Sequence, residues 1–123
     1  MDPHVRAMIV EDEIIIAWDL KIQLERLGSE VVAISDNADR AVGDARDKHP
    51  DIIFMDIILK GSQTGIDAAL RIRSFSDVPI VYITGNTHLL DDSTMRATRA
   101  QGLCTKPVNR ETIISMLRYA AGV

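Results

Sequence analysis

Short apolar runs alternate along the whole chain with longer stretches that are apolar on one side only. The run with the fewest polar interruptions is Asp51-Ile52-Ile53-Phe54-Met55-Asp56, where four apolar residues lie between two aspartates. Such a run predicts a strand buried on both faces, as in a parallel sheet that helices cover from both sides. Four further runs predict strands at residues 5–10, 30–34, 78–83 and 103–105.

The stretches between these runs have the spacing of helices that bury one face. They predict helices at about 13–27, from a cap at Asp36 or Asn37 to His49-Pro50, at about 65–74, at about 91–101, and after Asn109. The segment 91–101 is polar, which predicts irregular boundaries. The residues expected to face inward are Ile16, Ala17, Leu20, Leu24 and Leu27; Ala38, Ala41, Val42 and Ala45; Ile66, Ala69, Leu70 and the stem of Arg73; and Ile113, Ile114, Leu117 and Ala120.

The fivefold alternation of strand and helix predicts an α/β fold. Its sheet is expected to be parallel, with right-handed crossovers and helices on both faces. Periodicity alone does not give the order of the strands.

Composition narrows the class of protein. The chain has 123 residues, of which 46% are apolar, so we expect one soluble globular domain over 1–123 with no effector domain. Its net charge is −4 and it has no basic run, which argues against direct binding of nucleic acid. Its single cysteine, Cys104, excludes an internal disulfide. Since no stretch resembles a signal peptide or a membrane span, we expect a cytoplasmic protein without membrane contact.

The first predicted helix carries a second apolar stripe, nearly opposite its inward one. At about 100° per residue, Ile15, Trp18 and Ile22 share this outer stripe, with Ile14 at its edge. One stripe is enough to dock a helix on a sheet, so the outer stripe predicts an exposed patch. Alternatively, a neighbouring helix, most plausibly the last one, covers part of it, or the exposure has no function.

Polar residues stand where four of the strands end. Glu11-Asp12, Asp56, Thr84 and Lys106 follow the first, third, fourth and fifth strands, and in a parallel sheet these ends share one edge. Clustered carboxylates repel each other unless a cation lies among them, and hard oxygen ligands suit Mg²⁺. A metal, a lysine and a hydroxyl are what a transferring phosphoryl group needs, with Asp56 as its nucleophile.

Each of these residues also has an ordinary structural explanation. Asp56 could cap a turn, Glu11-Asp12 could begin a helix, Thr84 could be a turn residue, and Lys106 could be a solvated charge. Their recurrence at the same end of four strands favours the functional interpretation.

Four motifs together resemble the receiver domain of two-component response regulators, over essentially the whole chain. They are Val10-Glu11-Asp12-Glu13, Met55-Asp56, Ile83-Thr84-Gly85 and Thr105-Lys106-Pro107-Val108. The resemblance implies a flavodoxin-like (βα)5 three-layer sandwich with strand order 2-1-3-4-5. Because no effector domain is expected, the resemblance is to a stand-alone receiver.

The resemblance also implies roles for the residues at the sheet edge. Asp56 would accept a phosphoryl group from a histidine kinase or a histidine phosphotransfer protein. Lys106 would pair with that group, and Thr84 would move toward it. The bond between Lys106 and Pro107 would be cis. The Mg²⁺ ligands would be Glu11, Asp12, Asp56 and the backbone carbonyl of Ile58.

The expected function is therefore a phosphorylation-dependent switch that changes how the domain binds a downstream protein. It is a phosphoacceptor that takes part in its own phosphotransfer and dephosphorylation, rather than an enzyme. By the same resemblance, Ile15, Trp18 and Ile22 would dock on the helices of the phosphodonor.

The sequence also offers two other functions. Leu103 stands where many receivers have an aromatic residue, which favours a phosphorylation-independent interaction module on the same fold. A phosphatase or mutase with Asp56 as nucleophile is disfavoured, because dehalogenase-like hydrolases need a second aspartate where this chain has Ile58.

Overall fold

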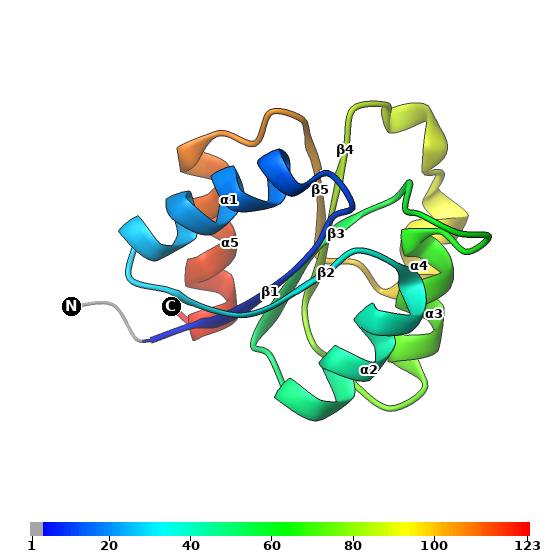
Figure 1. Cartoon of the computed structure of the whole chain (residues 1–123), viewed down its shortest axis with the longest axis horizontal. Coiled ribbons are helices and arrows are strands. Elements are labelled where there is room, and N and C mark those ends of the chain that lie inside the picture. The colour runs from blue at the N-terminus through cyan, green and yellow to red at the C-terminus, as the bar shows by residue number, and fades with distance from the viewer. Residues whose placement is uncertain (1–3) are drawn as a thin grey trace.

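A five-stranded parallel sheet forms the centre of the protein, in the order β2-β1-β3-β4-β5 (Figure 1). The structure is a computed structural model that describes residues 4–123. Its strands are β1 Arg6–Val10, β2 Glu30–Ser35, β3 Ile52–Asp56, β4 Ile80–Thr84 and β5 Gly102–Thr105. Both the parallel sheet and the strand order implied by the resemblance are confirmed.

Helices cover both faces of the sheet and give the predicted three layers (Figure 1). Helices α1 and α5 lie on one face, and α2, α3 and α4 lie on the other. Their bounds are α1 Ile14–Arg26, α2 Ala38–Lys48, α3 Gly65–Arg73, α4 Asp92–Thr98 and α5 Arg110–Ala121, and a short 3-10 helix spans Thr87–Leu89. No helix among the described residues is both long and apolar enough to cross a membrane.

Side-chain caps explain where the helices begin. Of the two candidates for α2, Asn37 is the cap, since its side chain accepts a hydrogen bond from the backbone N–H of Arg40 at 2.9 Å. Asn109 caps α5 as predicted. Helix α3 begins with a capping box, in which Thr64 and Asp67 satisfy each other's backbone N–H groups.

The core matches the predicted pattern in β3 and α2 but not in α3. All five β3 residues are buried, as are the four inward residues predicted for α2. In α3, the prediction for Leu70 was wrong: its side chain is 47% exposed, while Ala68 and Ile72 are buried. Gly65 lies directly against the β3 backbone. At about 100° per residue, Ala68 and Ile72 fall on the same face of α3 as Gly65, whereas Leu70 does not.

Helix α4 is shorter than the predicted segment 91–101. It ends at Thr98 because Arg99 adopts a left-handed conformation, with φ of 50°. The guanidinium of Arg73 then holds this end of the helix, since its Nε donates to the Thr98 carbonyl at 2.6 Å and its Nη1 to the Val78 carbonyl at 2.6 Å. The predicted segment is therefore a short helix whose C-terminal end accepts a hydrogen bond from Arg73.

Candidate functional site

The carboxyl ends of β1, β3, β4 and β5 bring the predicted polar residues to one edge of the sheet. Glu11, Asp56 and Thr84 are buried there, with 5%, 7% and 2% of their surfaces exposed. Asp12 and Lys106 are half-buried. The predicted site is therefore a sheltered cluster of charges rather than a solvated row of side chains.

Three carboxylates lie close enough together to hold one cation. Glu11, Asp12 and Asp56 each offer an oxygen, and these oxygens lie within 4.8 Å of one another. Carboxylate oxygens are hard ligands, so the chemistry of the set fits Mg²⁺. The remaining predicted ligand, the backbone carbonyl of Ile58, stays a prediction, and the Ile58 side chain is 62% exposed.

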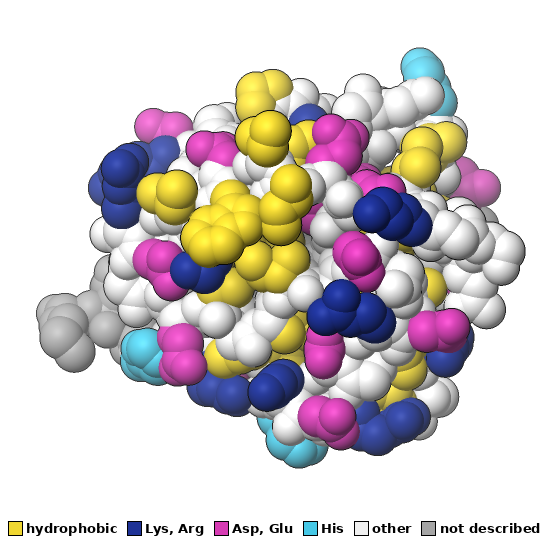
Figure 2. Space-filling model, in the orientation of Figure 1, with side chains coloured by type: hydrophobic (Ala, Val, Ile, Leu, Met, Phe, Trp, Pro, Cys, Tyr) yellow, Lys and Arg dark blue, Asp and Glu magenta, His cyan; other side chains and the backbone are white. Residues whose placement is uncertain are grey.

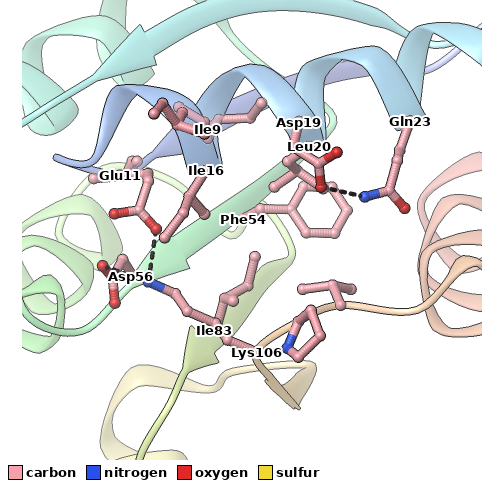
Figure 3. A pocket seen from close by; sticks show the side chains of 15 residues that line it. Ile9, Glu11, Ile16, Asp19, Leu20, Gln23, Phe54, Asp56, Ile83 and Lys106 are labelled. Atoms are coloured by element: carbon pink, nitrogen blue, oxygen red, sulfur yellow. Dashed lines mark hydrogen bonds and ion pairs between the residues drawn. The ribbon is translucent and has the colours of Figure 1, made fainter.

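Lys106 places its ammonium between two of these carboxylates (Figure 3). Its Nζ lies 2.7 Å from Oε1 of Glu11 and 3.1 Å from Oδ2 of Asp56. Burial lowers the pKa of Lys106, but the hydrogen bonds and charges of the two carboxylates outweigh this and raise it. The bond from Lys106 to Pro107 is cis, as expected. The contact with Glu11 was not predicted, because it depends on the path of the lysine side chain across the edge.

Lys106→Met is expected to tighten Mg²⁺ binding about fivefold, because it removes an ammonium that competes for the same oxygens. A fivefold change in affinity corresponds to about 1 kcal/mol. This is well below the Coulomb energy of two opposite charges in contact near a protein surface. Calorimetric titration with Mg²⁺ measures it. The control is Lys21→Met, which removes a surface ammonium paired with Glu25 at 3.0 Å and should leave Mg²⁺ affinity unchanged. Equal affinities in all three proteins would contradict the competition.

The hydroxyl of Thr84 is engaged by the loop that follows β4. Its Oγ1 donates to the carbonyl of Asn86 at 3.1 Å and accepts from the backbone N–H of Asn86 at 3.0 Å. The carbonyl of Thr84 accepts from the N–H of Lys106 at 2.9 Å. Thr84 thus links the loop after β4 to the lysine end of β5.

Gly65, at the start of α3, lies directly against the backbone of Asp56. A Cβ at position 65 would lie 2.0 Å from the Asp56 carbonyl oxygen, closer than any side-chain carbon can approach. The N–H of Gly65 donates to the Ile57 carbonyl at 2.7 Å. This close packing was not predicted from the sequence, because a glycine at the start of a helix does not by itself indicate which backbone lies against it.

The predicted docking residues are not part of the acidic cluster but lie on the outer face of α1. An apolar patch gathers over this helix (Figure 2), and its members are exposed by 61%, 81%, 50% and 43% for Ile14, Ile15, Trp18 and Ile22. The predicted exposure of the stripe is confirmed. Lys21 lies over the Trp18 ring, with its Nζ 4.9 Å from the ring centre.

Residues 7–118 match the family described as the response regulator receiver domain. The chain belongs to that family. Its members are domains of phosphorylation-based two-component signalling, in agreement with the motifs at the sheet edge.

Relatives and solved structures agree with this assignment. The phyllosphere-induced regulator PhyR of Methylorubrum extorquens is 34% identical over 84 residues, which are 68% of this chain and 32% of that protein. The signal receiver domain of a modulated diguanylate cyclase from Desulfovibrio desulfuricans is 33% identical, with a TM-score of 0.83 over 98% of this chain and 95% of the other. The chain spans 32% to 49% of the curated relatives PhyR and the mycobacterial regulator MtrA.

A third receiver resembles this chain in fold. The receiver domain of a sensor histidine kinase from Pseudomonas aeruginosa is 24% identical, with a TM-score of 0.84 over 98% of this chain and all of the other. That receiver has a magnesium ion coordinated in its active-site cleft.

Proposed function

We propose that this receiver domain accepts a phosphoryl group on Asp56 from a histidine kinase or a histidine phosphotransfer protein of the cytoplasm, and changes its binding to a partner protein in response. One observation carries the proposal. The Asp56 carboxylate lies among the carboxylates of Glu11 and Asp12 and pairs with Lys106 at 3.1 Å. This is the combination of nucleophile, metal ligands and fixed positive charge that phosphoryl transfer uses.

The phosphoryl transfer is a single displacement at phosphorus. An Asp56 carboxylate oxygen attacks the phosphorus of a phosphohistidine, and the P–N bond breaks as the P–O bond forms. The electron pair of the broken bond stays on the donor's imidazole. Lys106 neutralises charge on the phosphoryl oxygens. Mg²⁺, held by Glu11, Asp12 and Asp56, would supply further charge neutralisation at those oxygens.

Phosphorylation of the wild-type protein by acetyl phosphate is expected to vanish in excess chelator and to fall at least tenfold in Asp12→Ala. The reason is that phosphoryl oxygens and Asp56 repel each other unless a metal neutralises them. Intact-mass spectrometry measures the phosphorylated fraction. Asp47→Ala, which removes an exposed acid of α2, is the control and should behave like the wild type. Undiminished phosphorylation in chelator would rule out the metal's role.

The α1 patch supports the partner part of the proposal. Apolar patches of this kind often mark binding surfaces, and tryptophan is favoured at the centre of interfaces. Ile15 of the patch lines one pocket together with Glu11 and Asp56, so the patch borders the acidic cluster. We propose that Ile15, Trp18 and Ile22 insert between two helices of the phosphodonor and bring its phosphohistidine over Asp56.

Trp18→Ala is expected to separate docking from chemistry. Transfer from the cognate protein donor should fall at least tenfold, because about 1.4 kcal/mol of docking energy is lost. Phosphorylation by acetyl phosphate should stay nearly unchanged, since the carboxylates are intact. Tyr119→Ala is the matched control: Tyr119 is 54% exposed, but lies on α5. An equal loss of phosphorylation with both donors would show that the patch has only a structural role. No loss with either donor would show that the protein donor docks on another surface.

Leu103 supports a second candidate function, a phosphorylation-independent interaction module. It lies on β5 beside Tyr82 of β4 and is 36% exposed, and an aliphatic side chain there has no ring to reorient. Partner binding that is the same for phosphorylated and unphosphorylated protein would favour this second function.

A further inference from the structure

A pocket of about 400 Å³ opens beneath α1, on the face of the sheet away from α2, α3 and α4 (Figure 3). Its floor is made by Ile9, Phe54 and Ile83, one residue from each of three neighbouring strands. Its walls are α1 on one side, and Pro107 and Val108 of the loop after β5 on the other. The volume lies within the range of small-molecule sites.

The pocket exists because the part of the chain that faces α1 next to the acidic cluster is the loop after β5 and not a helix. Helix α5 begins only at Arg110 and buries Ile113 and Leu117 farther along the chain. The lining is mainly apolar, and no side chain among the described residues fills the space. Protein interiors are otherwise packed as densely as organic crystals, so an apolar space of this size suits an apolar occupant.

Charged groups lie only at the two ends of the pocket (Figure 3). One end holds Glu11, Asp56 and Lys106, where the ammonium is already paired with both carboxylates. The other end holds Asp19, whose Oδ2 accepts a hydrogen bond from Nε2 of Gln23 at 2.9 Å. Because Lys106 pairs with the carboxylates at the first end, Asp19 is the charge that a ligand can meet, which favours a positively charged ligand and disfavours an anion.

We propose that this pocket is a binding site for an amphipathic organic cation. Its apolar body would lie on Ile9, Phe54 and Ile83, and its ammonium would pair with Asp19. Asp19 is the better partner, because it is exposed and its second oxygen is open to a ligand, whereas Glu11 and Asp56 are engaged by Lys106. The pocket borders the outer patch of α1: Ile15 lines both, and Asp19 lies between them, whereas Ile14, Trp18 and Ile22 do not line the pocket.

The test compares three probes with the same phenylbutyl body and different heads: 4-phenylbutylamine, 4-phenylbutanol and 5-phenylvalerate. Each is titrated into the full chain while the methyl signals of Ile9, Ile83 and Val108 are followed by NMR. The amine should shift these signals saturably, with a Kd below about 1 mM. The alcohol and the carboxylate should bind at least fivefold more weakly. Added Mg²⁺ should change the Kd of the amine less than twofold, because Asp19 lies away from the three-carboxylate cluster.

Variants identify the site and the charge. Asp19→Asn should remove the preference for the amine over the alcohol. Val108→Trp should fill the pocket and abolish binding of all three probes, and its methyl spectrum shows whether it is folded. Ile22→Ala, on the outer face of the same helix, should bind the amine like the wild type.

Three outcomes would overturn the proposal. The first is equal affinity for the amine and the carboxylate. The second is a set of shifts centred on Ile14 and Ile22, which would place the probe on the outer patch. The third is no saturable shift with any probe while the same methyl signals respond to a protein phosphodonor, which would make the pocket part of a protein interface.

Discussion

Asp56→Asn is expected to abolish phosphorylation by both acetyl phosphate and the protein donor, to below about 1% of the wild-type level. The amide keeps the shape of the side chain but removes its charge and its nucleophilic oxygen, so the loss reports chemistry rather than folding. Intact-mass spectrometry after incubation with donor and Mg²⁺ measures it.

The chain offers a matched control for this experiment at the other end of the same strand. Asp51 immediately precedes β3, is exposed, and accepts a hydrogen bond from the backbone N–H of Arg6 at 2.8 Å. Asp51→Asn makes the same chemical change and should be phosphorylated like the wild type. If Asp56→Asn were phosphorylated as fully as Asp51→Asn, the phosphoacceptor would be a different residue.

Gly65→Ala is expected to destabilise the domain by about 3 kcal/mol, at the upper end of what overpacking costs. The added methyl would lie 2.0 Å from the Asp56 carbonyl oxygen and 3.0 Å from Cγ of Met55. Backbone cannot yield as a flexible side chain can, so α3 must move away from β3. Chemical denaturation measures the change in the free energy of unfolding.

Gly43→Ala is the control for the glycine effect itself. Gly43 lies inside α2, where an added Cβ would meet nothing within 4 Å. Alanine is the better helix former, so this variant should gain about 0.5 to 1 kcal/mol. Destabilisation of both variants by the same amount would show that close contact with Asp56 is not the cause.

Short-range patterns in the sequence were sufficient to predict a parallel α/β fold and the polar residues that meet at one edge of its sheet, whereas the strand order came from the resemblance to receivers. Buried runs such as Ile52–Asp56 predict parallel strands, and parallel strands bring Asp56, Thr84 and Lys106 to one edge wherever they stand in the chain. The two stripes of α1 were also readable, since a helix has a fixed period. Trp18 is half exposed as that period predicts.

The features that the sequence did not reveal depend on contacts between distant elements. The rotation of α3, which exposes Leu70 and buries Ile72, follows from the approach of Gly65 to β3. The pairing of Lys106 with Glu11 depends on how one long side chain crosses the sheet edge. The pocket beneath α1 is a space between elements, and a space leaves no pattern in the residues that border it.

A hydroxyl has a single proton to donate, and in this protein Thr84 gives it to the carbonyl of Asn86. A phosphoryl oxygen on Asp56 could receive that proton only if the carbonyl gave it up. The two hydrogen bonds therefore exclude each other, and the loop after β4 must rearrange whenever Thr84 turns toward Asp56. If Asp56 is phosphorylated as proposed, this change of hydrogen-bond acceptor would couple the acidic cluster to the surface loop without the aromatic ring that Leu103 replaces. The free energy of the hydrogen bond between Thr84 and Asn86 would then reduce the free energy that phosphorylation supplies for binding a partner.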